Sequence, residues 1–143
     1  AQIGQSTSAI VKNEFVDDSA YATVQEIFKA TGSVHEIAEK DFSTFAAIAG
    51  SSPALIYMFI DAMARAGVLH GIPKDQATAI VAETVRASAE MILQSGENPW
   101  SLVDKVSSPG GTTVAGVVSL EQNHFIATVI DAISATIEKE KNL

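Results

Sequence analysis

The chain has 143 residues, of which 47% are hydrophobic and 18% are charged, a length that suits one domain with or without a small additional piece. Its net charge of −8, with scattered lysines and arginines, argues against nucleic acid or an anionic membrane as a partner, and the absence of cysteine excludes disulfides and thiolate metal sites. A mean hydropathy of +0.21 with so few charges predicts a homo-oligomer that hides apolar surface.

The start of the chain bears on its location and completeness. No signal-peptide pattern is present, and Asp61 and Arg65 interrupt the longest apolar run before it reaches the ~18 residues of a membrane span. We therefore expect a cytoplasmic protein without a membrane segment. The chain opens at Ala1 directly into a strand-like run, so we also expect a piece of a longer protein.

The first part of the chain predicts a strand, a helix and a second strand. The first strand covers Thr7–Lys12, Asp17 and Asp18 suit a helix N-cap, and Gly32 is expected to stop that helix before a strand at Ser33–Ile37. Two strands and one helix cannot cover both faces of a sheet. This segment therefore reads as the end of an α/β unit whose remaining strands are missing.

Only helices are predicted after this segment. Asp41 is expected to cap a short helix that ends near Gly50, and Ser52 to cap a longer helix from Pro53 to about Ala66. The longer helix is apolar nearly all round, so we expect deep burial, with a subunit interface as one place for it.

Four more helices complete the chain. Gly67–Pro73 is expected to be a turn, Gly96 to end the next helix, and Asn98 to cap the one after it. The four helices are expected at Lys74–Gln94, Trp100–Lys105, Thr113–Glu121 and Phe125–Lys139. In the first of them Ile80, Val81, Thr84, Val85, Ser88 and Ile92 form the predicted buried face.

The segment Val106–Thr113 carries the functional prediction. It contains a proline, two adjacent glycines and then hydroxyls at a helix start, which leaves unpaired backbone N–H groups open to a ligand. Such an entrance favours a small carboxylate or phosphate. Thr112 follows Gly111 where a nucleotide-binding loop needs lysine, so ATP and GTP are excluded. The alternative is an ordinary Ser/Thr-capped helix after a tight turn.

Other chemical motifs are weak. His35, His70 and His124 have no second ligand at metal-binding spacing, so no metal site is expected. Ser51 lacks the second glycine of a nucleophile elbow, so acyl-transfer catalysis is not expected.

The Val106–Thr113 loop, together with residues of the helices on either side of it, resembles a known family. The chain resembles the C-terminal helical half of pyrroline-5-carboxylate reductase over its whole length. The resemblance implies a mainly α fold, a helical dimerisation domain like the C-terminal domain of 6-phosphogluconate dehydrogenase at 40–143, preceded by a β-α-β remnant of a Rossmann domain at 1–39. The matching residues are Gly50 to Ala54, Ala66 to Val68, Gly71 to Pro73, Val106 to Thr113, Leu120, Glu121 and Phe125.

The same resemblance implies reduction of 1-pyrroline-5-carboxylate to L-proline with NADPH or NADH, the last step of proline biosynthesis, by a homodimer or homodecamer. Ser108 and the N–H groups of Gly111 and Thr112, with Gly110 in the same loop, would hold the substrate carboxylate. Thr113 would be the catalytic residue, hydrogen-bonded to the ring nitrogen. The resemblance assigns the cofactor mainly to residues outside this chain, so we expect the chain alone not to bind NADPH.

One departure from the family pattern and two alternatives complete the analysis. Asn123 and His124 lie where the family often has two glycines, and we expect the turn to survive because Asn tolerates the left-handed conformation. The alternatives are a helical dimerisation module without catalysis and a regulatory domain that senses proline or a similar carboxylate.

Overall fold

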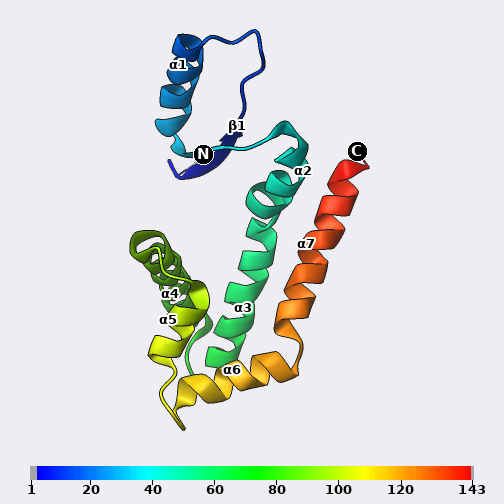
Figure 1. Cartoon of the computed structure of the whole chain (residues 1–143). Helices are drawn as coiled ribbons and strands as arrows, with labels where there is room; N and C mark the ends of the chain where they lie inside the picture. Colours follow the sequence, from blue (N-terminus) through cyan, green and yellow to red (C-terminus); the bar gives the residue numbers. More distant parts are fainter. Residues whose placement is uncertain (1–2, 143) are drawn as a thin grey trace. The chain divides into compact units, whose positions relative to one another are not determined.

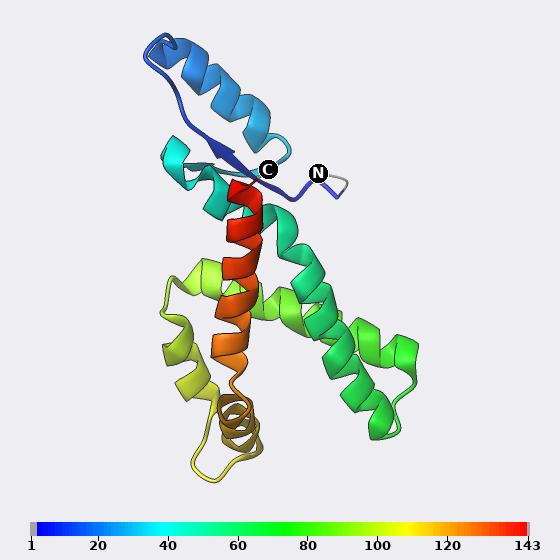
Figure 2. The same ribbon diagram turned by 90° about the vertical axis from the view of Figure 1, so that its right-hand side faces the viewer.

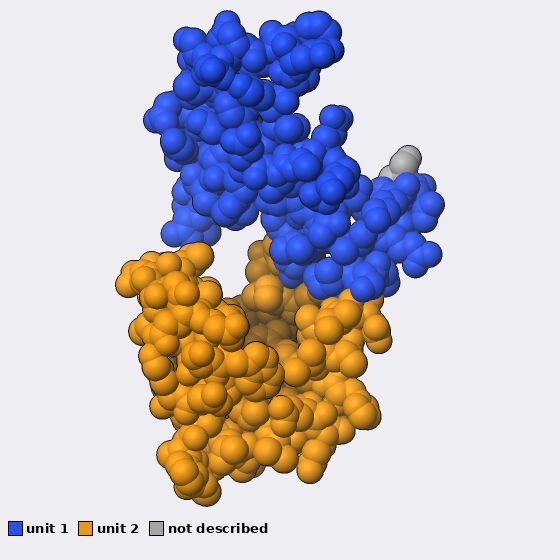
Figure 3. All heavy atoms as spheres, viewed as in Figure 1, with its two compact units in different colours: residues 1–52, 133–143 blue, residues 53–132 orange. Residues whose placement is uncertain are grey.

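The computed structural model describes residues 3–142, which form a mainly helical chain that begins with two short strands (Figure 1). The chain divides into two compact units, residues 1–52 with 133–143 and residues 53–132 (Figure 3). The elements are β1 (Ser6–Ile10), α1 (Asp18–Lys29), β2 (Gly32–Glu36), η1 (Glu39–Asp41), α2 (Phe42–Phe45), η2 (Ala46–Ser51), α3 (Pro53–Leu69), α4 (Lys74–Ser95), α5 (Pro99–Val106), α6 (Thr112–Gln122) and α7 (Phe125–Lys141).

The first unit contains a parallel strand pair connected by a helix. Strands β1 and β2 pair from Ser6 opposite Gly32 to Ile10 opposite Glu36, and α1 packs against β2. Asp17 caps α1, since its Oδ1 accepts a hydrogen bond of 2.7 Å from the Ala20 N–H. The predicted strand–helix–strand order and the Asp17 cap are confirmed, with strand limits shifted by one or two residues.

Gly32 has a different role from the predicted one. Helix α1 ends at Lys29, and Gly32 is the first residue of β2, with φ of +154°. A Cβ atom at Gly32 would lie 2.0 Å from the backbone oxygen of Ser6 on the paired strand. The sheet therefore requires glycine here because the two backbones approach closely.

Neither predicted side-chain cap before α3 forms. Asp41 ends the short 3-10 helix η1 and is the N-cap residue of α2, as predicted, but its side chain makes no capping hydrogen bond. Ser52 is helical, its hydroxyl donates to the Ile48 carbonyl, and its N–H reaches back five residues to the Ala47 oxygen at 3.1 Å. The preceding helix does not stop at Gly50 but widens into the π-helical segment η2. Because Pro53 has no N–H and its ring would clash in a regular helix interior, the wider turn accommodates it.

The helical stretch from η1 through α3 bears on the prediction that the chain has no membrane-spanning segment. Residues Glu39–Leu69 form a helix that is long and apolar enough, by length and composition, to cross a membrane, and only 6% of the most apolar window is buried in the chain. Core helices of soluble proteins pass the same test. Asp61 and Arg65 therefore do not by themselves exclude a membrane-spanning length for this helix, contrary to the prediction.

Helix α3 is less buried within the chain than predicted. Ala64 is its one buried residue, whereas the side chains of Tyr57 and Met58 are 69% and 70% exposed. The helix packs on α4, and Phe59 also contacts the Phe125 ring at a centroid distance of 6.1 Å, but most of its large apolar side chains stay exposed. The predicted deep burial is therefore not found among the residues that the structure describes.

The second unit is built on α3 and α4, which a short turn connects and which cross at a wide angle (Figure 2). Ala64, Ala77 and Val81 form its buried core, flanked by Ile60 and Val85. These side chains are small, so the two helices approach closely. The core is therefore sensitive to added volume.

The predicted buried face of α4 is only partly correct. Val81 is buried and Val85 packs against the core, but Ile80 is 48% exposed and Ile92 is also exposed. The face that meets α3 is marked by its small residue Ala77 rather than by its largest apolar residues. The bulkier side chains are uncovered in the single chain.

Helices α4 to α7 have the predicted limits to within two residues, whereas α3 ends later than predicted. Helix α3 extends to Leu69, so Gly67 lies in the helix and not in the turn. Gly96 ends α4 in the left-handed conformation, with φ of +63°, as predicted. Asn98 caps α5 through a hydrogen bond of 2.9 Å from the Trp100 N–H, which confirms that prediction.

Asp61 joins α3 to the start of α4 through a small charge network. Its carboxylate accepts hydrogen bonds from Lys74 and from Arg65, as the i, i+4 spacing of the latter predicts. These two hydrogen bonds, that of Lys74 first, lower the pKa of Asp61 below its ordinary value of 3.8.

The Asp61→Asn variant is expected to be slightly less stable than the parent chain above pH 3.8, because the ionised carboxylate stabilises the folded state there. A lowered carboxyl pKa contributes stability that is lost as the pH falls through the folded-state pKa, so the difference should shrink below pH 3.8. Melting curves between pH 3 and pH 6, at low and at 1 M salt, measure it. A difference that grows on acidification would contradict this assignment.

Candidate functional site

The loop between α5 and α6 is closed by a tight turn. The Gly111 N–H donates to the Ser108 carbonyl over 2.9 Å, Pro109 is the second residue of the turn, and Gly110 is the third with φ of +69°. Proline followed by a residue with positive φ, closed by this hydrogen bond, is the arrangement of a type II turn. The residue order Ser-Pro-Gly-Gly therefore determines the local backbone.

Gly111 brings Ser108 next to the start of α6. A Cβ atom at Gly111 would lie 2.5 Å from the Ser108 hydroxyl oxygen and 3.0 Å from its carbonyl oxygen. The Ser108 side chain thus occupies the space that a larger residue at Gly111 would fill. Because Gly111 has no side chain, the Ser108 hydroxyl can lie beside the N-terminus of α6, the positive end of an eleven-residue helix.

The start of α6 offers free backbone donors. Gly111 is its N-cap residue, and the Ala115 N–H makes the first helical hydrogen bond, to the Gly111 carbonyl. The N–H groups of Thr112, Thr113 and Val114 therefore have no acceptor within the helix. The Gly111 N–H, which the resemblance assigned to the substrate carboxylate, instead donates to the Ser108 carbonyl, so that part of the prediction is corrected. Thr112 is the first residue whose amide is open to a ligand.

The predicted site residues are exposed and lie together at this entrance. Ser108, Gly110, Thr112 and Thr113 are solvent-exposed, and Gly111 is half-buried. Gly111 is the N-cap residue of α6, and among residues 3–142 no side-chain capping hydrogen bond to this helix is formed, so the alternative of a Ser/Thr-capped helix is wrong. The entrance is accessible to a small anion in the single chain.

A groove between α4 and α5 approaches the same loop. It has a volume of about 750 Å³, is lined mainly by apolar side chains that include Met91, Leu102 and Val106, and reaches to within two residues of Ser108. Glu97 and Lys105 also line it and form an ion pair with each other. The groove therefore offers apolar contact area rather than free charges.

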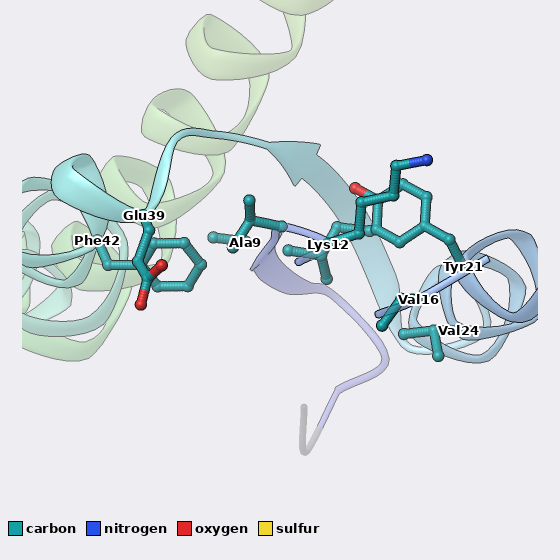
Figure 4. Close-up of a pocket in the computed structure, with 9 residues that line it drawn as sticks. Ala9, Lys12, Val16, Tyr21, Val24, Glu39 and Phe42 are labelled. Atoms are coloured by element: carbon teal, nitrogen blue, oxygen red, sulfur yellow. The ribbon is translucent and has the colours of Figure 1, made fainter. Parts of the chain in front are cut away.

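A cavity of about 670 Å³ in the first unit has a different character (Figure 4). Val16, Val24 and Phe42 line it together with Lys12 and Tyr21. Lys12 is paired with Asp18, which raises the pKa of Lys12, and burial is the main cause that raises the pKa of Tyr21. Lys12 and Tyr21 therefore do not change charge near neutral pH, and Glu39 is the other ionisable side chain that lines this cavity.

The turn between α6 and α7 survives in a form that the sequence did not predict. Asn123 is not left-handed; its side-chain amide instead donates to the Ser119 carbonyl at 2.8 Å. His124 adopts the left-handed conformation, with φ of +58°. His124 is exposed, and within residues 3–142 no three His, Cys, Asp or Glu side chains are grouped to hold a metal ion.

The comparisons with known proteins point to one family. A family model described as pyrroline-5-carboxylate reductase dimerisation matches residues 39–143. The pyrroline-5-carboxylate reductases of Escherichia coli and Aquifex aeolicus are 41% and 39% identical to this chain, over 100% and 99% of its length and 53% of theirs. The chain thus spans about half the length of these relatives.

Two solved structures extend the similarity to the fold. The 1-pyrroline-5-carboxylate reductase of Streptococcus pyogenes matches 99% of this chain and 55% of its own, with a TM-score of 0.92 and 48% identity. A crystal structure of the Plasmodium falciparum pyrroline carboxylate reductase with NADP bound matches 98% of this chain and 53% of its own, with a TM-score of 0.89 and 36% identity. The mainly helical fold with an initial two-stranded parallel sheet is therefore shared with these structures.

Proposed function

Because the chain belongs to the pyrroline-5-carboxylate reductase dimerisation family, we propose that it forms the substrate-binding and dimerisation half of an enzyme that reduces 1-pyrroline-5-carboxylate to L-proline. The observation that carries this proposal is the open N-terminus of α6 with the Ser108 hydroxyl beside it. The proposed reaction is the last step of proline biosynthesis.

In this proposal the entrance to α6 binds the carboxylate of the substrate. The Thr112 N–H and the Ser108 hydroxyl would donate to its oxygens, while Gly110 and Gly111 shape the turn that brings them together. Charge-assisted hydrogen bonds at a helix N-terminus are stronger than neutral ones, and the helix dipole adds about 0.3–1 kcal/mol. The free donors thus suit an anionic group without requiring a lysine or arginine.

Thr113 would hold the ring nitrogen of the substrate. Its hydroxyl lies one residue further along α6 than the carboxylate donors, so the two contacts together would fix the orientation of the ring. Bound NADPH or NADH would supply a hydride to the carbon of the protonated imine, whose nitrogen already carries the proton that the secondary amine of proline retains. The sequence contains no G-x-G-x-x-G pattern, so we assign no residue of this chain to the cofactor.

The Thr113→Ala variant of the protein made from the whole reading frame is expected to show about tenfold lower kcat/KM, the loss expected for one hydrogen bond of about 1.4 kcal/mol. Steady-state oxidation of NAD(P)H measures this. The stabilisation of the folded protein by added proline should fall in parallel. Thr113→Ser retains the hydroxyl and is the matched control. An unchanged proline-dependent shift of the melting temperature would remove Thr113 from the site.

Turnover of 1-pyrroline-5-carboxylate by that protein tests the proposed activity and separates it from the alternatives. Stabilisation by proline without turnover would favour a regulatory domain that senses a carboxylate. Dimerisation without either response would favour a purely structural module.

We further propose that a second copy of the chain covers the exposed apolar surface of α3 and the groove between α4 and α5. The family description names dimerisation. In an isolated chain the side chains of Tyr57 and Met58 on α3 would be exposed to water, which is unfavourable for such an apolar surface. The proposal includes assembly of dimers into a decamer and a cytoplasmic location, which the lack of cysteine suits.

The Met58→Asp variant is expected to be mostly monomeric at micromolar concentration, because a buried unpaired carboxylate at an interface costs several kcal/mol. Light scattering coupled to size exclusion gives the mass. Ala79→Asp, at an exposed position on α4 in line with Glu83, is the matched control and should retain the parent mass. A parent chain that is monomeric at the same concentration would contradict the proposed interface.

A further inference from the structure

No further inference is drawn: the strongest candidate, the apolar groove between α4 and α5, belongs to the subunit surface already proposed, and nothing in the structure shows that anything other than a second copy of the chain covers it.

Discussion

Replacing Gly111 by alanine in the whole protein is expected to lower kcat/KM for 1-pyrroline-5-carboxylate by about 10²-fold, the loss typical of a misplacement of about 1 Å in a substrate-binding group. The added Cβ would lie 2.5 Å from the Ser108 hydroxyl oxygen and 3.0 Å from the Ser108 carbonyl oxygen, which are separations that the turn cannot retain. Ser108 would have to move away from α6, and the hydrogen bond that closes the turn would lengthen.

Gly116→Ala in the same helix is the control for this variant. A Cβ at Gly116 would meet no atom of the chain within 4 Å, so its kcat/KM should remain near that of the parent protein. Both variants should melt within a few degrees of the parent, because neither position belongs to the α3–α4 core. Equal activity of Gly111→Ala and the parent would mean that Ser108 is not positioned by this contact.

The Ala77→Leu variant is expected to lose about 3 kcal/mol of unfolding free energy, at the upper end of the cost of overpacking a core. Ala77 is 3% exposed. Its Cβ packs so closely on Gly67 of α3 that a Cβ added at Gly67 would lie only 3.1 Å from it. The three additional carbons have no space unless α3 and α4 separate. Thermal and urea unfolding curves measure the loss, which corresponds to a fall in melting temperature of roughly 10 °C.

Ala79→Leu provides the comparison, because Ala79 lies on the exposed side of the same helix and the substitution adds the same volume. Its unfolding free energy should change by less than about 0.5 kcal/mol. If the two leucine variants are equally stable, the α3–α4 contact is not the core of the second unit.

Local chemistry explains the parts of the fold that the sequence predicts well. Asp17, Gly96 and Asn98 act through their own backbone or that of residues within four positions, so their roles as caps can be read without knowing the rest of the fold. The prediction for Gly32 is wrong for the opposite reason, and the prediction for Ser52 is wrong because the helix does not end before Ser52. The requirement at Gly32 comes from Ser6 on the paired strand, and that at Ser52 comes from the π-helical turn before Pro53.

The candidate site was predictable in composition but not in geometry. The hydroxyls and glycines indicate an anion-binding helix start, and the order Ser-Pro-Gly-Gly is itself a type II turn signal that could have predicted the bond from Gly111 to Ser108. The half-buried state of Gly111 and the contact beside it depend on the path of the whole loop. Helix α3 shows a related limit, since an apolar pattern predicts burial but does not say which molecule provides it.

Under the proposed dimerisation, the uncovered apolar side chains of α3 also make the stability of this protein depend on its concentration. When association hides such residues, the folded state is favoured by mass action, so dilution weakens it even though no contact within a chain has changed. A newly synthesised chain would expose the apolar side chains of α3 until it bound a second chain. The rate of synthesis would then influence how many copies reach the assembled state before they aggregate.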